Sequence, residues 1–292
     1  MLVATAYCTL LERKLLAGAQ RRKGPNKVSW KGAAQPLADA LKLLNKERVV
    51  PSRATKSVFL WAPGFALCAS LSSWFVWPHW DEAVYCFSFV VPVYFCLTSL
   101  HVFGVVLAGW ASNSMYAMLG TLRAIAQTIS YELPLVLIVL GLCFQVKTFS
   151  FLDFSVVGGY GMNFLWLDLP LFYVWTILSV AELHRAPFDL PEAESELVSG
   201  YNTDYGAVGF ILLFISEYAN VVFVGQMMSI LWLHSFWWFL KVIFGCLFSG
   251  FVLLLRAVFP RVRYNSLMEV CWKGFLPFTI VWFLFLFLLN WV

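Results

Sequence analysis

Charge is scarce in this chain. Only 12% of its 292 residues are Asp, Glu, Lys or Arg, whereas 61% are hydrophobic and 18% are aromatic. A water-soluble globule of this size would leave far too much of that apolar surface exposed. The composition therefore excludes a soluble enzyme and indicates a protein whose solvent is lipid.

Several motifs of soluble catalysis are also missing. The chain has no G-x-G-x-x-G before a helix, no P-loop, no H-E-x-x-H and no glycine-flanked serine elbow, so we expect it to bind no nucleotide and to carry no catalytic residue by itself. Its seven cysteines include no C-x-x-C pair, and we interpret them as small hydrophobes instead of metal or cluster ligands. The four histidines never share a helix face, which leaves a haem pair across helices as a remote alternative.

Long apolar runs are what the chain does contain. Runs of about 20 residues are long enough to cross a bilayer as helices, and the start of the chain lacks the early positive charge of a cleavable signal. We predict an all-α, polytopic membrane protein with about eight transmembrane helices in a single domain, 1–292. The expected spans lie near residues 1–19, 57–77, 84–109, 119–144, 164–183, 205–228, 236–258 and 274–292.

Basic residues are distributed unevenly among the loops. Ten of the twenty Lys and Arg residues lie in the first loop, 20–56, and six others lie in or near the other odd-numbered loops, which include the fifth loop, 184–204, and the seventh loop, 259–273. The positive-inside rule then places the odd-numbered loops on the side of synthesis. Within the first loop, Leu37, Ala40, Leu41 and Leu44 recur at helical spacing after Pro36, which predicts an amphipathic helix on the membrane surface. A solvated loop helix of no special function is the alternative.

Carboxylates occur inside the apolar spans. Glu132, Glu182 and Glu217 would each cost about 2.5–3.5 kcal/mol at mid-membrane if charged and unpaired. We therefore expect them to be protonated, paired or hydrated, which is what a proton relay requires. For Glu182, an ion pair with Arg185 at a helix end is the plain alternative.

The fifth loop gathers a second group of carboxylates. Asp189, Glu192, Glu194 and Glu196 fall within eight residues, and such clustering beside a membrane span indicates proton or ion handling. Asp189 followed by Pro191 and Glu192 also fits a helix capping box, so a purely structural role for Asp189 stays open.

These residues occur in blocks that resemble one known family, subunit 1 of respiratory complex I. The similar blocks follow one another in family order over nearly the whole chain, and no single short motif carries the resemblance. They are Glu12–Lys14, Arg22–Asn26, Gln35–Leu44 with Lys46 and Glu47, Gly109–Ser114 continuing through Glu132, Ala181–Asn202 and Arg261–Pro277.

The resemblance implies a role in coupling quinone reduction to proton translocation, with three groups of site residues. It places Arg13, Arg22, Asp39, Arg185, Phe188 and Asp189 along a quinone tunnel. It places Glu132, Glu182, Glu192, Glu194 and Glu217 on an acidic proton path. It places Glu12, Lys23, Glu196, Arg256, Arg261 and Arg263 at interfaces or in loops.

The resemblance also implies the setting of the chain. Ubiquinone would be the substrate of the complex, and NADH, FMN and the iron–sulfur clusters would be bound only by partner subunits. The partners would be the quinone-site subunits of the peripheral arm, the adjacent small membrane subunits and lipids, with no nucleic acid. The mitochondrial inner membrane is the expected location, with the bacterial plasma membrane and the thylakoid as alternatives.

The sequence departs from the family in three places. Its first helix is short, Leu183-His184 stands where Thr-Asn is more usual, and Asn265 stands where an aspartate is common. The membrane subunit of an ion-pumping hydrogenase is the main alternative, because it shares the acidic path. A free-standing secondary transporter would predict inverted repeats, and the loop at 20–56 has no counterpart near 160–200.

Overall fold

The protein is helical, as its composition predicts. The computed structural model describes residues 2–79, 82–83, 89–151, 154, 164–191, 199–233 and 238–291. Within those ranges the only β structure is the short antiparallel pairing of β1 (Pro78–His79) with β2 (Glu82–Ala83). The all-α prediction is therefore confirmed.

Six helical segments of the described chain are long and apolar enough to cross a membrane. Two of them are composite, because η2 (Ser73–Val76) extends α3, while α11 (Tyr264–Glu269) and the π-helical η5 (Val270–Phe275) lead into α12. The apolar part of α7 is shorter, at Leu169–Glu182. The long helices are α3 (Lys56–Ser72), α4 (Val90–Ser112), α5 (Met115–Val146), α7 (Phe164–Glu182), α9 (Ala207–Trp232), α10 (Trp238–Val258) and α12 (Leu276–Trp291).

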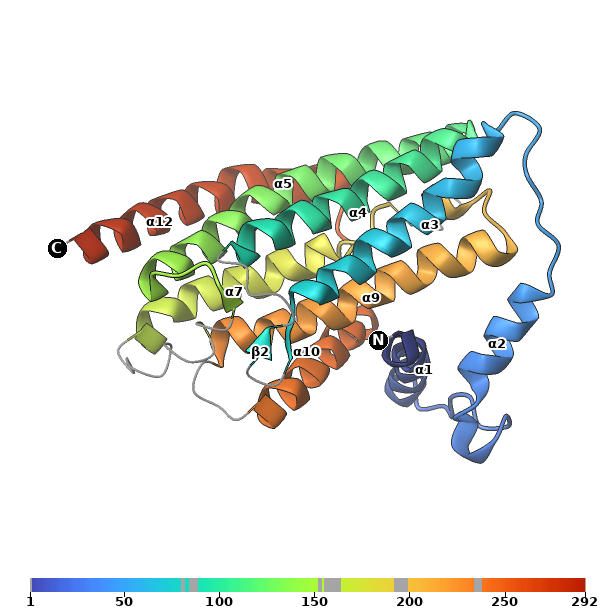
Figure 1. Ribbon diagram of the computed structural model, residues 1–292, viewed down its shortest axis with the longest axis horizontal. Helices are drawn as coiled ribbons and strands as arrows, with labels where there is room; N and C mark the ends of the chain where they lie inside the picture. The colour runs from blue at the N-terminus through green and yellow to red at the C-terminus, as the bar shows by residue number, and fades with distance from the viewer. Residues whose placement is uncertain are drawn as a thin grey trace.

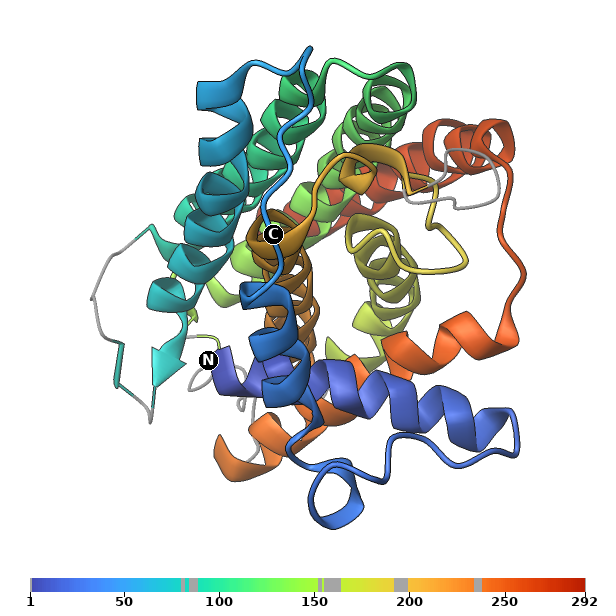
Figure 2. The ribbon, with the colours of Figure 1, turned by 90° about the vertical axis from the view of Figure 1, so that its right-hand side faces the viewer.

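The N-terminal helix, α1 (Leu2–Ala19), takes a different direction from the bundle. In Figure 1 the helices α3, α4, α5, α7, α9 and α12 run along the long axis, whereas α1 is seen end-on; Figure 2 shows α1 lengthwise, crossing one side of the bundle. The helix carries Glu12, Arg13 and Lys14, so its middle must meet polar partners and not lipid tails. The sequence predicts a first span at 1–19 that runs with the other transmembrane helices, whereas α1 crosses them.

The predicted amphipathic helix is present as α2 (Gln35–Leu44), preceded by the short η1 (Trp30–Gly32). Leu37, Leu41 and Leu44 are exposed, and no residue of α2 is fully buried in the chain. Its leucines therefore remain available to lipid or to another subunit.

Aromatic rings fill the centre of the bundle. Trp74 packs edge-on against Phe223 with ring centroids 5.3 Å apart, and Tyr94 stacks on Phe223 at 5.2 Å. Such contacts add about 0.5–1.5 kcal/mol each beyond area burial. They join η2, α4 and α9 into one core.

Pro134 leaves a backbone carbonyl without its helical partner inside α5. Because proline has no amide hydrogen, the carbonyl of Ser130 receives no bond from position 134. The thiol of Cys271 donates to that carbonyl at 2.9 Å, and Trp272 Nε1 donates to Ser130 Oγ at 3.1 Å. The π-helical segment η5 therefore supplies one hydrogen bond to the carbonyl that the proline leaves without a helical partner, and a second one to the side chain of the same serine.

We expect Gly104→Ala to destabilise the protein by about 1–3 kcal/mol, the usual cost of overpacking. A Cβ at this position of α4 would lie 2.8 Å from the Cα of Ala66 in α3, so the two helices would have to separate. The measurement is the thermal unfolding midpoint in detergent. Gly64→Ala, where a Cβ meets nothing within 4 Å, is the matched control, and equal midpoints for the two variants would contradict the close helix contact.

Candidate functional site

A polar cavity of about 610 Å³ lies between α1, α9, the end of α10 and the loop after α7. Its wall combines aromatic and apolar side chains, including Leu16, Phe210 and Phe214, with a group of charged ones. The charged residues and the tyrosine that line it are Glu12, Arg13, Arg185, Asp189, Tyr218, Arg256 and Arg261.

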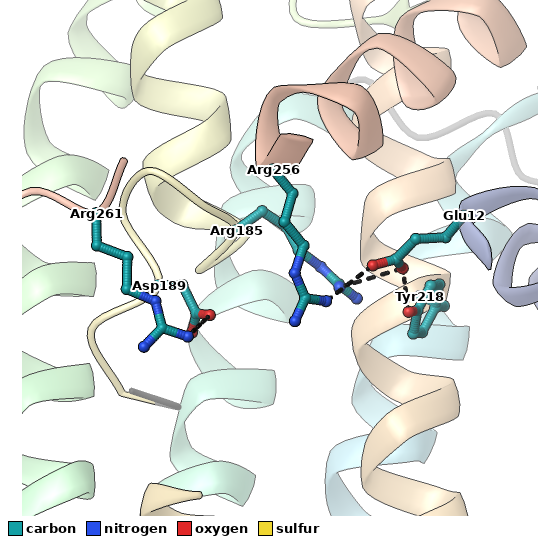
Figure 3. Close-up of polar contacts among 6 residues, drawn as sticks. All are labelled: Glu12, Arg185, Asp189, Tyr218, Arg256 and Arg261. Atoms are coloured by element: carbon teal, nitrogen blue, oxygen red, sulfur yellow. Dashed lines mark hydrogen bonds and ion pairs between the residues drawn. The ribbon is translucent and has the colours of Figure 1, made fainter. Parts of the chain in front are cut away.

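Glu12 is the centre of this charged group (Figure 3). Its side chain is nearly buried, and its carboxylate receives Arg256 Nη1 at 3.0 Å and Arg185 Nη1 at 3.4 Å. The hydroxyl of Tyr218 also donates to it, and the Arg185 guanidinium lies over the Tyr218 ring at 4.4 Å. One carboxylate from α1 therefore joins α9, α10 and the loop after α7.

Asp189 lies in the same cavity and pairs with a different arginine. Its Oδ2 is 3.4 Å from Arg261 Nη2, and the amide of Val262 donates to the carbonyl of Pro187 at 3.0 Å. The chain after α10 thus holds the loop after α7 in place. Any helix that Asp189 would cap lies in residues outside the described part of the chain.

Among the described residues, one other expected tunnel residue lines this cavity. Arg13 lines it and forms an ion pair with Asp39 of α2 at 2.6 Å. Phe188 packs near the ring of Tyr131, with centroids 6.3 Å apart. Arg22, Lys23 and Arg263 are exposed and are not among the described residues that line the cavity.

A second, smaller cavity of about 50 Å³ gathers the three glutamates of the apolar spans. Glu132, Glu182 and Glu217 all line it, although α5, α7 and α9 contribute one each. Ser99 Oγ donates to Glu132 at 2.5 Å, and the hydroxyl of Tyr201 donates to Glu217. At about 10–15 Å³ per water, the space admits a few water molecules beside these carboxyl groups.

Two histidines also line the smaller cavity. His101 of α4 is held through both ring nitrogens, by Asn220 Nδ2 at 3.1 Å from Nδ1 and by Ser216 Oγ at 3.4 Å from Nε2. An amide nitrogen can only donate, so the ring is assigned as the neutral form with its hydrogen on Nε2. The sequence alone did not single out His101. A polar pair at positions 216 and 220 of one apolar span is the signal that points to it.

His184 lies in the loop directly after α7. Burial, with a smaller contribution from His101, lowers the pKa of this imidazole from 6.5 to about 4. His184 is therefore neutral near pH 7. Its backbone has a positive φ of 51°, a left-handed conformation that His and Asn adopt more readily than most residues.

Three predicted site residues of the fifth loop, Glu192, Glu194 and Glu196, lie outside the described residues. Within the part of the chain that the structure describes, no group of three or more His, Cys, Asp or Glu side chains is arranged to hold a metal ion.

Comparisons with known proteins give the family. A model of the family described as NADH dehydrogenase matches residues 1–287. NADH-ubiquinone oxidoreductase chain 1 of Aedes aegypti is 42% identical over 98% of this chain and 91% of its own length. An NADH-quinone oxidoreductase subunit from Paramagnetospirillum magneticum is 43% identical, covering 97% of this chain and 86% of its own length. The chain therefore belongs to the NADH dehydrogenase family of multi-pass membrane proteins.

Proposed function

We propose that this chain is the membrane subunit of a proton-pumping NADH:ubiquinone oxidoreductase that forms both a quinone tunnel and the start of an acidic proton path. It acts as a non-redox subunit of the enzyme and has no catalytic activity alone. The relatives named above carry the names of NADH-ubiquinone and NADH-quinone oxidoreductase subunits, which favours a quinone as the redox partner.

The observation that carries this proposal is the contact between the two cavities. At three places, consecutive residues line different cavities: His184 and Arg185, Tyr201 and Asn202, and Glu217 and Tyr218. In each pair the first residue lines the small acidic cavity and the second lines the large one. The walls of the two cavities are therefore continuous along the backbone at these three places, which supports a coupling of events in one cavity to the other.

The large cavity has the chemistry that a quinone requires. Its phenylalanines and leucine suit an isoprenoid tail, while its arginines carry several N–H donors for oxygen atoms. Reduction to the quinol consumes two electrons and two protons. The electrons would come from iron–sulfur clusters of partner subunits, and NADH and FMN would likewise be bound there.

The small cavity supplies sites that can hold and pass on protons. A carboxyl group in an apolar span is costly when charged, so Glu132, Glu182 and Glu217 are not all ionised at the same time. They hold protons and exchange them through hydroxyl groups and water. Charge rearrangement around Arg185 and Asp189 during quinone reduction would shift that exchange. The acidic loop 184–204 would carry the path onward.

The cellular setting follows from the relatives. The chain would lie in the mitochondrial inner membrane, where it would contact the quinone-site subunits of the peripheral arm, adjacent small membrane subunits and lipids. Native-gel separation of gently extracted membranes with an NADH dehydrogenase stain tests this placement. Recovery of the chain in a band with nickel–iron hydrogenase subunits, or alone, would contradict it.

Glu132→Gln is expected to lower quinone-linked turnover and proton pumping by at least about tenfold, because the amide keeps the size of the carboxyl group but cannot carry a proton. NADH–ferricyanide activity should be unchanged, since that reaction bypasses the membrane subunits. Glu47→Gln, at an exposed position of the first loop, is the control. Undiminished pumping by the Glu132 variant would rule out the relay role.

Glu12→Gln should destabilise the assembled protein by about 3 kcal/mol and raise KM for a short-chain quinone, because it leaves the buried Arg185 without its carboxylate partner. Glu269→Gln is the matched control, since Glu269 and Lys273 form an exposed ion pair worth about 0–1 kcal/mol. Native-gel yield and quinone kinetics are the measurements. An equal native-gel yield and an equal KM for quinone in the two variants would contradict the claim that Glu12 holds the arginine cluster together.

His184→Asn should reduce the loss of stability on acidification. The unfolded imidazole binds a proton below about pH 6.5, but the folded one stays neutral down to about pH 4. Protonation therefore favours the unfolded state, and stability falls as the pH is lowered through this window. The unfolding midpoints of wild type and variant should keep a constant difference above pH 7 and diverge in favour of the variant between pH 6 and 4. Parallel curves throughout would refute this assignment.

A further inference from the structure

Gln127 of α5 is hydrogen-bonded to a segment that contributes residues to both cavities. Its side chain is completely buried. Its Nε2 donates hydrogen bonds to two backbone carbonyls, that of Ala181 at 2.8 Å and that of Phe188 at 2.9 Å. One side chain thus joins the last turn of α7 to the loop that follows it.

The orientation of the Gln127 amide is determined by these partners. Both partners are carbonyl oxygens, which only accept, so the NH2 end must face them and a flipped amide would place oxygen against oxygen. Both hydrogens of Nε2 are used. The bond pair therefore spans the segment 181–188 from end to end, and Arg185 lies inside it.

This segment contributes to both cavities. Glu182, next to Ala181, lines the acidic cavity, and Arg185 lines the quinone cavity and contacts Glu12. Pro187 inside the segment and Asp189 just after it are held by Val262 and Arg261 of the chain after α10. Gln127 adds two side-chain hydrogen bonds from α5.

On its own helix, Gln127 stands next to the acidic cavity. Ala124 and Thr128 of α5 line that cavity, and Glu132 lies five residues further along. A displacement of the 181–188 segment would therefore act on the helix that carries Glu132. Such a direct bonded connection between two sites is a physical route for coupling free energy.

We propose that Gln127 is a positioning residue that couples the quinone cavity to the acidic cavity, by holding the segment with Glu182 and Arg185 against the helix of Glu132. This inference rests on the proposed function. Gln127 itself touches neither the quinone nor a transferred proton. Its role is to make the position of α5 depend on the position of the loop.

The test uses the assembled complex in membrane vesicles, with protons pumped per electron pair as the readout. Gln127→Glu keeps the shape of the side chain but places carboxylate oxygens against two carbonyl oxygens, which repel them. Gln127→Met removes both N–H donors without adding charge. Both variants should lower the ratio by about two- to threefold, with native-gel assembly and NADH–ferricyanide activity retained. Thr121→Val is the control, because this buried hydroxyl on the same helix donates to the carbonyl of Met118 in its own preceding turn.

The outcomes separate this inference from the proposed function. An unchanged ratio in an assembled Gln127→Met complex, even with slower turnover or a higher KM for quinone, would overturn the coupling role. If Glu132→Gln abolishes pumping in the same vesicles, the proposed function stands despite that result. If Glu132→Gln also pumps normally, the proposed function itself fails.

Discussion

The buried carboxylate of Glu12 is the interaction on which the polar half of this structure depends. A single residue of α1 binds Arg185 from the loop after α7, Arg256 from α10 and Tyr218 from α9. A charge in this position is costly unless it is paired and hydrogen-bonded. The four elements must therefore meet at this point, and the large cavity is formed where they meet. The same requirement accounts for the direction of α1, which crosses the bundle.

In the smaller cavity, the described hydrogen-bond partners of two carboxyl groups are hydroxyl groups. Ser99 bonds Glu132, Tyr201 bonds Glu217, and Asn220 with Ser216 holds His101. Neutral partners leave the carboxyl groups free to change protonation state, whereas an arginine would keep a carboxylate ionised. The two cavities thus differ in electrostatics although they share three pairs of consecutive residues. This difference is what a quinone site next to a proton path requires.

Helix α5 connects these features. It carries Glu132 into the smaller cavity, and Gln127 reaches from it to the loop after α7, which contributes Arg185 to the large cavity. Near Pro134, the carbonyl of Ser130 bonds to Cys271. In lipid, backbone groups released by a proline must be satisfied by neighbouring protein. The Ser130 carbonyl of α5 and the π-helical segment η5 are therefore complementary.

The sequence by itself determined the helical class, most of the spans, the surface helix and the family, because apolar run length and local motifs are properties of contiguous residues. It also singled out the three glutamates by the cost of placing charge in apolar runs. Only the tertiary structure decided that these glutamates share one cavity, that Glu12 lies at the centre of the arginine cluster, and that His101 and Gln127 belong to the site. Those facts depend on contacts between residues 50 to more than 240 positions apart. No local pattern encodes such distances, since they arise from how whole helices pack.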